Sequence, residues 1–251
     1  MPFVRSRPFF APHHGASSQA IVGGGSYARP GLVSLSHRGI LFLDEMPEFK
    51  RETLDMLRQP LEDGTITVSR AKNTYTYPAK FMLVGAMNPC PCGYYPDRNR
   101  CNCTDVQIAR YLSKISGPIL DRIDICVEVM RMEPKEIADA GNTESVKRMT
   151  SSEIRERVKA AVRVQEMRYR DESFKFNSLV PTSKINKYIP LGPNESDFVY
   201  SAYESMNMSM RSFYKLIRVA RSIADYDGDE KVEIKHLAEA SCYRFPEYMG
   251  G

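Results

Sequence analysis

A continuous apolar run that ends in two adjacent acidic residues is the feature that most constrains the fold of this chain. The run covers residues 39–43 (GILFL), and Asp44 and Glu45 follow it directly. An unbroken run of this length is typical of a strand buried on both faces of a parallel sheet. In open α/β sheets, functional side chains lie just beyond the carboxyl ends of the strands. The run therefore predicts an α/β sheet with two carboxylates at its functional edge.

The acidic pair has two interpretations. In an ATPase, the first carboxylate holds Mg²⁺, usually through water, and the second polarises the attacking water. Alternatively, both acids simply face solvent after an ordinary strand. Asn88 favours the ATPase, because it follows a second predicted buried strand over residues 81–86, where a neutral amide can orient a water or a γ-phosphate. An asparagine that caps a turn before Pro89 is the competing interpretation.

Other patterns predict the elements around these strands. Residues 1–36 are rich in Gly, Pro, Ser and His, which indicates loops rather than core. A helix is expected over residues 52–61, a second helix over 105–114 and a strand over 123–129. Two β-rich segments, residues 65–69 and 73–77, predict a hairpin with Arg70 and Lys72 at its tip.

A change of pattern divides the chain. Residues 131–150 are charged and contain Pro134 and Gly141, so we interpret them as a linker. After the linker the pattern is helical, with helices expected over residues 151–170, 182–189, 195–206, 210–226 and 234–243. The predicted organisation is an α/β core over residues 1–130, the linker, and an all-helical domain over 151–251.

The bulk composition is that of an ordinary globular protein. The formal net charge is +4, so a nucleic-acid partner is compatible with the charge but not required by it. No run approaches the roughly 18 apolar residues of a membrane span, and the first residues lack the apolar stretch of a signal peptide. We therefore expect the protein in the cytosol, where its six cysteines favour free thiols or metal ligands over disulfides.

Four of the cysteines are grouped in one short segment. Cys90, Cys92, Cys101 and Cys103 form the pattern Cys-x-Cys-x8-Cys-x-Cys. Four thiolates match the closed tetrahedral shell of a structural zinc site, although a one-residue gap is less favourable than the usual Cys-x-x-Cys. Structural zinc is the favoured interpretation, and free thiols or disulfides are the alternatives.

Three further motifs have ordinary interpretations beside functional ones. His13 and His14 point in different directions because they are adjacent, so we expect them to order a loop or contact nucleic acid rather than to bind metal. Arg98 and Arg100 in the cysteine segment are expected to be solvated, with phosphate contacts as the alternative. Residues 225–230 resemble a calcium loop but lack its Gly and its bidentate Glu, so a turn between helices is expected.

Five motifs together resemble the ComM/YifB type of magnesium-chelatase-like AAA+ ATPases. In chain order they are FFAPHH (residues 9–14), VGGG (22–25), GILFLDE (39–45), NPCPCG (88–93) and SGPILDRID (116–124). The resemblance implies a partial AAA+ parallel-sheet core of the helix-2-insert group, with the insert at residues 1–36, followed by an all-helical lid.

The resemblance also implies roles for individual residues. Asp44 and Glu45 correspond to the Walker B pair and Asn88 to sensor 1. Arg122 corresponds to the arginine finger that reaches a neighbouring subunit's nucleotide, a task suited to a planar and permanently charged guanidinium. An Arg122 paired with Asp121 or Asp124 is the alternative. Arg211 corresponds to sensor 2 on the lid.

The chain contains no Gly-x-x-x-x-Gly-Lys-[Ser/Thr] string, the loop that cradles nucleotide phosphates. In the family that this chain resembles, this loop lies upstream of the motifs above. We therefore expect the parent protein to use ATP and Mg²⁺ and to form a ring, six-fold by analogy with that family, while this chain alone is catalytically silent.

Three functions follow as hypotheses. The first is a motor that remodels or translocates single-stranded or branched DNA, with the basic hairpin tip at Arg70 and Lys72 against the phosphates. The second is a motor subunit for magnesium insertion into a porphyrin, against which the cysteine segment argues. The third is a non-catalytic binding module supported by zinc.

Overall fold

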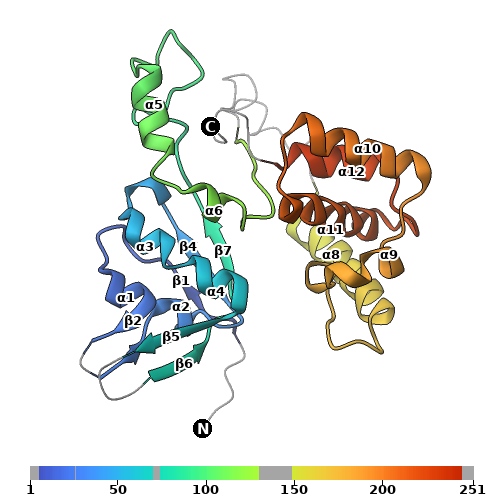
Figure 1. Cartoon of the computed structure of the whole chain (residues 1–251), viewed down its shortest axis with the longest axis horizontal. Helices are drawn as coiled ribbons and strands as arrows, with labels where there is room; N and C mark the ends of the chain where they lie inside the picture. Colours follow the sequence, from blue (N-terminus) through green and yellow to red (C-terminus); the bar gives the residue numbers. More distant parts are fainter. Residues whose placement is uncertain (1–5, 26, 70–73, 130–148, 245–251) are drawn as a thin grey trace. The chain divides into compact units, whose positions relative to one another are not determined.

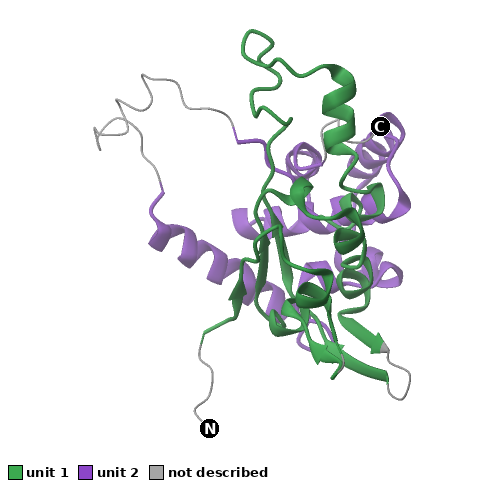
Figure 2. Cartoon of the chain, turned by 90° about the vertical axis from the view of Figure 1, so that its left-hand side faces the viewer, with its two compact units in different colours: residues 1–123, 245–251 green, residues 124–244 purple. Residues whose placement is uncertain are grey.

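The computed structural model of the chain describes residues 6–25, 27–69, 74–129 and 149–244 (Figure 1). Contacts divide the chain into two compact units with a boundary between Ile123 and Asp124 (Figure 2). Most of the predicted linker lies outside the described residues, as do Arg70 and Lys72. The two units are described separately below.

A three-stranded parallel sheet is the centre of the first unit. Its strands are β1 (Phe9–Phe10), β4 (Ile40–Leu43) and β7 (Met82–Gly85), in the order β1-β4-β7. Ile40 pairs with Phe9 on one side and with Met82 on the other. The predicted α/β class and both predicted strands are confirmed, but β7 is mostly exposed, so its predicted burial is wrong within the described residues. The expectation that residues 1–36 form only loops is wrong, because Phe9 and Phe10 form an edge strand of this sheet.

The two faces of the sheet differ in burial. Leu41 and Leu43 point to one face and are fully buried in the hydrophobic core of the unit. The opposite face carries Met82 and Val84 of β7, and Phe9 of β1 stacks there on Phe42. Met82 is 61% exposed and Phe9 is 60% exposed. Within the described part of the chain, the predicted burial of β4 is therefore confirmed for the face of Leu41 and Leu43 and wrong for the opposite face.

Short helices contribute side chains to the same hydrophobic core as the buried face of the sheet. A small antiparallel pair, β2 (Gly23–Gly24) with β3 (Arg29–Pro30), belongs to the same unit. The helical segments are α1 (Ser18–Val22), α2 (Leu32–Leu35), η1 (Met46–Glu48), α3 (Arg51–Asp55) and α4 (Arg58–Asp63). The single helix expected over residues 52–61 is wrong, because it is split into α3 and α4. Pro60 explains the break, since it has no N–H to donate to the carbonyl of Met56 and its ring would clash there.

The predicted hairpin is confirmed as β5 (Thr65–Ser69) paired with β6 (Thr74–Pro78). The predicted helix over 105–114 is observed as α5 (Asp105–Leu112), which starts with a Thr104–Gln107 capping box. A short helix, α6 (Gly117–Leu120), follows. The strand expected over 123–129 is not formed among the described residues. Its described residues have no regular secondary structure, and the Cys126 N–H donates to the Tyr243 carbonyl instead of to a strand ladder.

The second unit is all-helical, as predicted. Its elements are α8 (Ser151–Arg168), η2 (Asn177–Leu179), η3 (Thr182–Lys184), α9 (Ile185–Tyr188), α10 (Pro193–Ser205), α11 (Met210–Asp227) and α12 (Ile234–Cys242). The α11 helix contacts both α8 and α12, and its Leu216, Ala220 and Ala224 are buried between them. A parallel-sheet core followed by a helical domain is thus the observed architecture, as the resemblance implies.

A buried ionic network joins three elements of the helical unit. The Asp225 side chain in α11 is fully buried and accepts hydrogen bonds from both terminal nitrogens of Arg168, at 2.5 and 2.8 Å. Arg221 donates to the same carboxylate at 3.1 Å, and the Asn177 amide donates at 2.8 Å. The Tyr169 hydroxyl in turn donates to Asn177. Each of these partners donates a hydrogen bond to the Asp225 carboxylate. Removal of this carboxylate would therefore leave the guanidiniums of Arg168 and Arg221 without their counter-charge.

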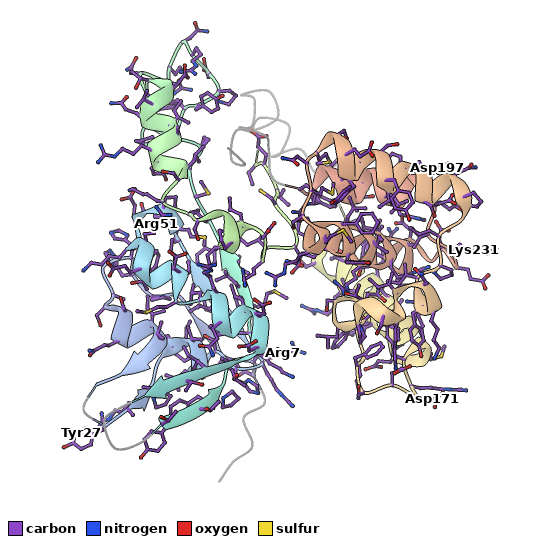
Figure 3. All side chains as sticks on the ribbon, in the orientation of Figure 1. Arg7, Tyr27, Arg51, Asp171, Asp197 and Lys231 are labelled. Atoms are coloured by element: carbon purple, nitrogen blue, oxygen red, sulfur yellow. The ribbon has the colours of Figure 1, made fainter. Side chains whose placement is uncertain are left out.

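We predict that Asp225→Ala destabilises the helical unit by about 3–5 kcal/mol, because two partly buried guanidiniums lose their counter-charge. Urea unfolding followed by circular dichroism measures the change. The control is Asp171→Ala, since Asp171 is 85% exposed on the outside of the unit and, within the described part of the chain, pairs only with its neighbour Arg170 (Figure 3). The control should change stability by less than about 0.5 kcal/mol. Equal effects of both variants would contradict a central role for the network.

Candidate functional site

The acidic pair lies at the carboxyl end of the central strand, as the sequence predicts. Asp44 and Glu45 directly follow β4, and both are exposed. The ladder continues past the strand end, because the Met46 N–H donates to the Ala86 carbonyl at 2.9 Å. The Asp44 carboxylate accepts the N–H of Glu45 at 2.9 Å, and none of the described cations pairs with it. Asp44 therefore presents an uncompensated carboxylate at the edge of the sheet.

The backbone of Glu45 is strained. Its φ angle is 49°, in the left-handed region that non-glycine residues rarely adopt. Such a conformation costs about 1–3 kcal/mol and is found preferentially at functional sites. Glu45 also begins the turn into η1, since the Glu48 N–H donates to its carbonyl at 2.7 Å. The surrounding hydrogen bonds therefore hold Glu45 in a position that an unconstrained chain would avoid.

Asn88 lies shortly after β7, the strand that neighbours β4 in the sheet. The residue is exposed, and Gly93 lies near it: a Cβ atom at Gly93 would lie 3.8 Å from the Asn88 amide carbon. Because β4 and β7 are parallel neighbours, their ends present Asp44, Glu45 and Asn88 at the same edge of the sheet. The role of Asn88 as a sensor remains a prediction.

His14 contacts Glu45, and no pattern in the sequence predicts this contact. Its Nδ1 lies 3.0 Å from Oε2 of Glu45. The histidine follows β1, the other neighbour of β4, so all three strands contribute to one edge. The sequence pattern offered no direct signal for this contact. Only the pairing of β1 beside β4 brings the two side chains together.

Arg122 is engaged within the first unit. Its guanidinium donates to the carbonyls of Arg58 and Pro118, at 3.1 and 2.6 Å, and forms an ion pair with Glu62. Its side chain is only 13% exposed. These contacts fasten α6 to α4, and they differ from the pairing with Asp121 or Asp124 considered above. An arginine-finger role, which remains a prediction, would require Arg122 to exchange these partners for a nucleotide.

Arg211 occupies the first turn of α11 in the helical unit and is exposed. Burial lowers the pKa of Lys215, one turn further along, and the positive charges of Arg244 and Arg211 act in the same direction. Asp124 opposes this effect through an ion pair with Lys215 at 2.9 Å. Arg211 therefore belongs to a basic group on the helical unit. Its sensor role remains a prediction.

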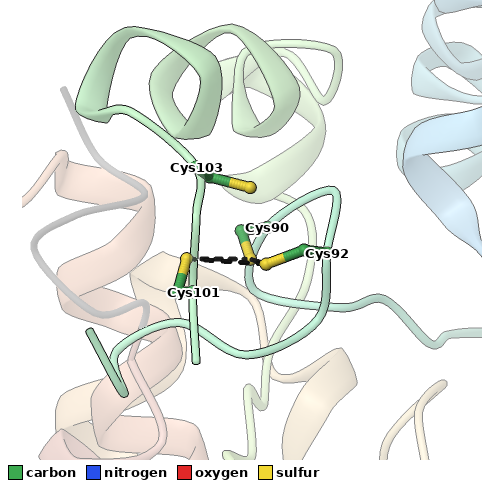
Figure 4. Close-up of side chains that lie close together, drawn as sticks. All are labelled: Cys90, Cys92, Cys101 and Cys103. Carbon is green, nitrogen blue, oxygen red and sulfur yellow. Dashed lines mark hydrogen bonds between the residues drawn. The ribbon is translucent and has the colours of Figure 1, made fainter. Parts of the chain in front are cut away.

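The four cysteines of the predicted metal motif converge on one point (Figure 4). The Sγ atoms of Cys90, Cys92 and Cys101 lie 3.3–3.8 Å apart, and those of all four cysteines, including Cys103, lie within 4.8 Å of one another. A tetrahedral zinc with bonds of about 2.3 Å would space its sulfurs about 3.8 Å apart. All four cysteines are free thiols, so the disulfide alternative is not observed. The cluster has the size and donor set of a metal site.

The thiols of this cluster differ in electrostatic environment. A hydrogen bond from the backbone of Tyr94 lowers the pKa of Cys92 to about 6. Burial raises the pKa of Cys101 to about 12 and also raises that of Cys103. Metal ligation requires thiolates. The buried thiols would become thiolates only beside a positive charge, which a bound cation would supply.

Arginine–aromatic pairs stabilise the loop that carries the cysteines. Arg98 lies over the Tyr95 ring, donates to the Cys103 carbonyl at 3.1 Å and pairs with Asp105. Arg100 stacks on Tyr94 at 4.4 Å from the ring centroid. Arg98 thus closes the loop, rather than being only solvated as expected.

A second cluster of possible metal ligands lies in the helical unit and consists of Asp227, Asp229 and His236. The Nδ1 of His236 accepts the Glu233 N–H, which directs its Nε2–H to Asp229 at 3.0 Å. Lys235 pairs with Asp229 as well. The group is therefore a capping network at the turn between α11 and α12, as expected for residues 225–230.

Comparison with known proteins identifies relatives along almost the whole chain. The family model described as "Magnesium chelatase, subunit ChlI" matches residues 1–137, and the model described as "Magnesium chelatase, subunit ChlI C-terminal" matches residues 148–244. Among the described residues, no helix has the length and apolar character needed to cross a membrane.

Individual relatives agree with the family models. "Competence protein ComM" of Haemophilus influenzae is 40% identical over 96% of the chain, and "Uncharacterized protein YifB" of Salmonella typhimurium is 41% identical over the same share. "Magnesium-chelatase 38 kDa subunit" of Acidiphilium rubrum is 27% identical over 44% of the chain. The chain spans 45% of ComM and 46% of YifB, so it covers about half the length of these relatives.

We predict that Arg122→Ala destabilises the contact between α4 and α6 by about 2 kcal/mol, because three charge-assisted hydrogen bonds are lost. Hydrogen exchange of the amides of α6, measured by mass spectrometry on the 251-residue chain, should accelerate accordingly. Arg51→Ala is the control, because Arg51 is 65% exposed and its pair with Asp55 is 3.9 Å long. Unchanged exchange in Arg122→Ala would show that Arg122 is not needed to hold α6.

Proposed function

Because this chain belongs to the magnesium-chelatase-like family of AAA+ type, together with ComM and YifB, we propose that it is part of an ATP-hydrolysing motor that acts on DNA. The observation that carries the proposal is that Asp44, Glu45 and Asn88 all follow neighbouring parallel strands at one edge of the sheet. In this assignment Asp44 holds Mg²⁺ and Glu45 polarises the attacking water. Asn88 orients that water or the γ-phosphate.

The free state of the Asp44 carboxylate supports this assignment. A structural acid at a strand end is normally paired or hydrogen-bonded, whereas Asp44 accepts one backbone N–H and has no cation partner among the described residues. Carboxylate oxygens are the ligands that Mg²⁺ prefers, and they bind it together with substrate phosphates. The residues present therefore fit a site for magnesium and nucleotide. When bound, the magnesium ion would neutralise charge on the phosphates.

Features of the sheet support the proposal that the motor includes more than this chain. The outer edge of β7 has no partner strand in the described residues, and the sheet face that carries Phe9, Met82 and Val84 is exposed. Parallel sheets are normally covered on both faces. The relatives are about twice as long, so we propose that the phosphate-binding loop and further strands lie in the region that precedes this chain in those proteins.

Arg70 and Lys72, which lie between β5 and β6 in the sequence, are the proposed DNA contacts, in a ring of subunits, six by analogy, that repeats them around a pore. The name of the ComM relative refers to competence, and it is this chain's similarity to ComM that favours DNA over other substrates. Arg122 is the proposed residue that reaches the nucleotide of a neighbouring subunit, and Arg211 the one that contacts nucleotide from the helical unit. We further propose that the cysteine cluster holds one structural zinc ion.

A motor for magnesium insertion into a porphyrin is the second candidate. The similarity to the 38 kDa magnesium-chelatase subunit favours it, but that similarity covers only 44% of the chain. Salt-dependent DNA binding separates the two candidates, since each phosphate contact that is lost lowers the salt slope by about one. Arg70→Ala with Lys72→Ala should lower this slope only if the hairpin contacts DNA.

We predict that a longer protein, extended over the preceding region of its relatives, hydrolyses ATP in a magnesium-dependent and DNA-stimulated manner. Glu45→Gln should lower kcat by about 100-fold or more, because the amide cannot polarise the attacking water. Binding of a fluorescent nucleotide should persist in this variant. A phosphate-release assay makes the measurement.

Two controls accompany this experiment. Glu52→Gln should retain full activity, because Glu52 is exposed on α3 rather than at the edge of the sheet. The 251-residue chain alone should show no hydrolysis. Activity of the chain alone, or of Glu45→Gln in the longer protein, would contradict the assignment.

We predict that native mass spectrometry of the chain shows one zinc ion per molecule. Cys92→Ser should lose the metal, because three thiolates no longer close the tetrahedral shell. Cys242→Ser should retain it, since Cys242 is exposed on α12 and lies outside the cluster. A metal-free mass together with four thiols that react freely with an alkylating agent would contradict the zinc site.

A further inference from the structure

A basic residue precedes each strand of the parallel sheet at its amino end. Arg7, Arg38 and Lys80 each stand two positions before the first residue of β1, β4 and β7, respectively. The first residues of these strands are register partners, so the three basic residues come from matching positions of neighbouring strands. Neighbouring strands lie about 4.8 Å apart. The three residues therefore form one group, here called the amino-edge cluster, on the edge of the sheet opposite the acidic pair.

Backbone hydrogen bonds hold the segments that carry the cluster side by side. The Arg38 N–H donates to the Lys80 carbonyl at 2.6 Å, and the Lys80 N–H donates to Nδ1 of His37 at 3.1 Å. On the other side of the central strand, the Ile40 N–H donates to the carbonyl of Pro8, the residue after Arg7, at 2.9 Å. The backbone positions of the three cations are therefore fixed relative to one another.

The amino-edge cluster lacks a counter-charge. Its three side chains are exposed, and within the described part of the chain none of them forms an ion pair or a hydrogen bond. The segments that lead into the strands, residues 6–8, 36–39 and 78–81, contain no acidic residue. By contrast, the side chains of Arg98 and Lys114 in the same unit each pair with a carboxylate. Grouped cations without acids create a positive potential that attracts anions.

The backbone of Arg38 is strained. Its φ angle is 59°, in the left-handed region that glycine and asparagine adopt more readily than arginine. Backbone strain at a residue that is neither of these is found preferentially at functional sites. The steric demands of the position therefore do not explain an arginine here, whereas a task for its guanidinium would.

The cluster lies at the base of the β5–β6 hairpin. The Ala79 N–H donates to the Gly64 carbonyl at 2.8 Å, which closes the base, and Lys80 follows directly. Each strand of the hairpin has five residues, so its ladder is about 17 Å long. Arg70 and Lys72, the DNA contacts proposed above, follow the far end of this ladder in the sequence. The cluster would therefore meet other phosphates than those two residues do.

We propose that Arg7, Arg38 and Lys80 form a second contact surface for the phosphate backbone of DNA. Guanidinium and ammonium groups are the usual phosphate contacts of DNA-binding proteins, and such contacts position the nucleic acid without reading its sequence. An acidic protein segment would meet the same charges, but the place of the cluster at the base of the hairpin favours DNA. The inference rests on the proposed function, in which the longer protein acts on DNA.

Binding of a fluorescent single-stranded oligonucleotide to the longer protein, measured over a range of salt concentrations, tests this surface. The combined variant Arg7→Gln, Arg38→Gln and Lys80→Gln should bind about tenfold more weakly or worse, because three phosphate contacts are lost. The slope of log K against log salt should fall by about two, since each contact to a single strand contributes about 0.7. Arg7→Lys with Arg38→Lys and Lys80→Arg should retain the slope, because the charges remain.

A second triple variant serves as the matched control. Lys50→Gln, Arg51→Gln and Arg110→Gln remove the same charge from exposed positions of the same unit, and Arg51 lies well away from Arg7 (Figure 3). The control should change affinity by less than about twofold and leave the slope unchanged. Equal losses in both triple variants would overturn the surface, because net charge rather than position would then explain binding. Circular dichroism of each variant shows whether the fold is retained.

The remaining outcomes separate this inference from the proposed function. If the wild-type protein binds DNA and the Gln variant of the cluster keeps its salt slope, the inference is overturned and the proposed function stands. If the wild-type protein shows no salt-dependent DNA binding, action on DNA is contradicted and the inference fails with it. Polyglutamate is the third probe. Tighter binding of polyglutamate than of DNA, lost in the Gln variant, would overturn the assignment to DNA in favour of an acidic protein partner.

Discussion

The parallel pairing of β4 with β1 and β7 is the constraint on which the first unit depends. Leu41 and Leu43 of β4 are buried in the core, and the strand is hydrogen-bonded along both of its edges. Because all three strands run in the same direction, the side chains that follow their carboxyl ends lie at one edge of the sheet. The acidic pair comes from the centre of this edge. His14 and Asn88 come from the two flanks.

This arrangement explains how the edge can carry exposed side chains on a well-ordered backbone. The backbone that carries the acidic pair is secured by the ladder, which continues beyond the strands through Met46 and Ala86. Strain at Glu45 can therefore be tolerated locally, because neighbouring hydrogen bonds compensate for it.

The helical unit is stabilised differently, by helix packing and a buried ion-pair network. Its helices pack around α11 and converge on the buried carboxylate of Asp225, which has guanidinium partners in both α8 and α11.

The elements that sequence patterns predicted well are those with strong local signals. The apolar runs of β4 and β7, the hairpin and the long helices of the second unit all have periodicities that few other structures share. The failures have physical causes. Pro60 divides a helix that spacing alone would continue, and Phe9 and Phe10 form a strand too short to have a period. The segment after Ile123 has strand-like composition, but no neighbouring strand pairs with it in the described residues.

The sequence by itself determined the kinds of chemistry available: a pair of carboxylates after a buried strand, an amide after the next strand, and four cysteines within one loop. These features are local, so the order of residues is enough to reveal them. Only the tertiary structure decided which groups meet. The approach of His14 to Glu45, the engagement of Arg122 with Glu62 and the closure of the four thiols on one point all join residues through folded backbone. Such contacts depend on strand order and loop geometry, which no local pattern encodes.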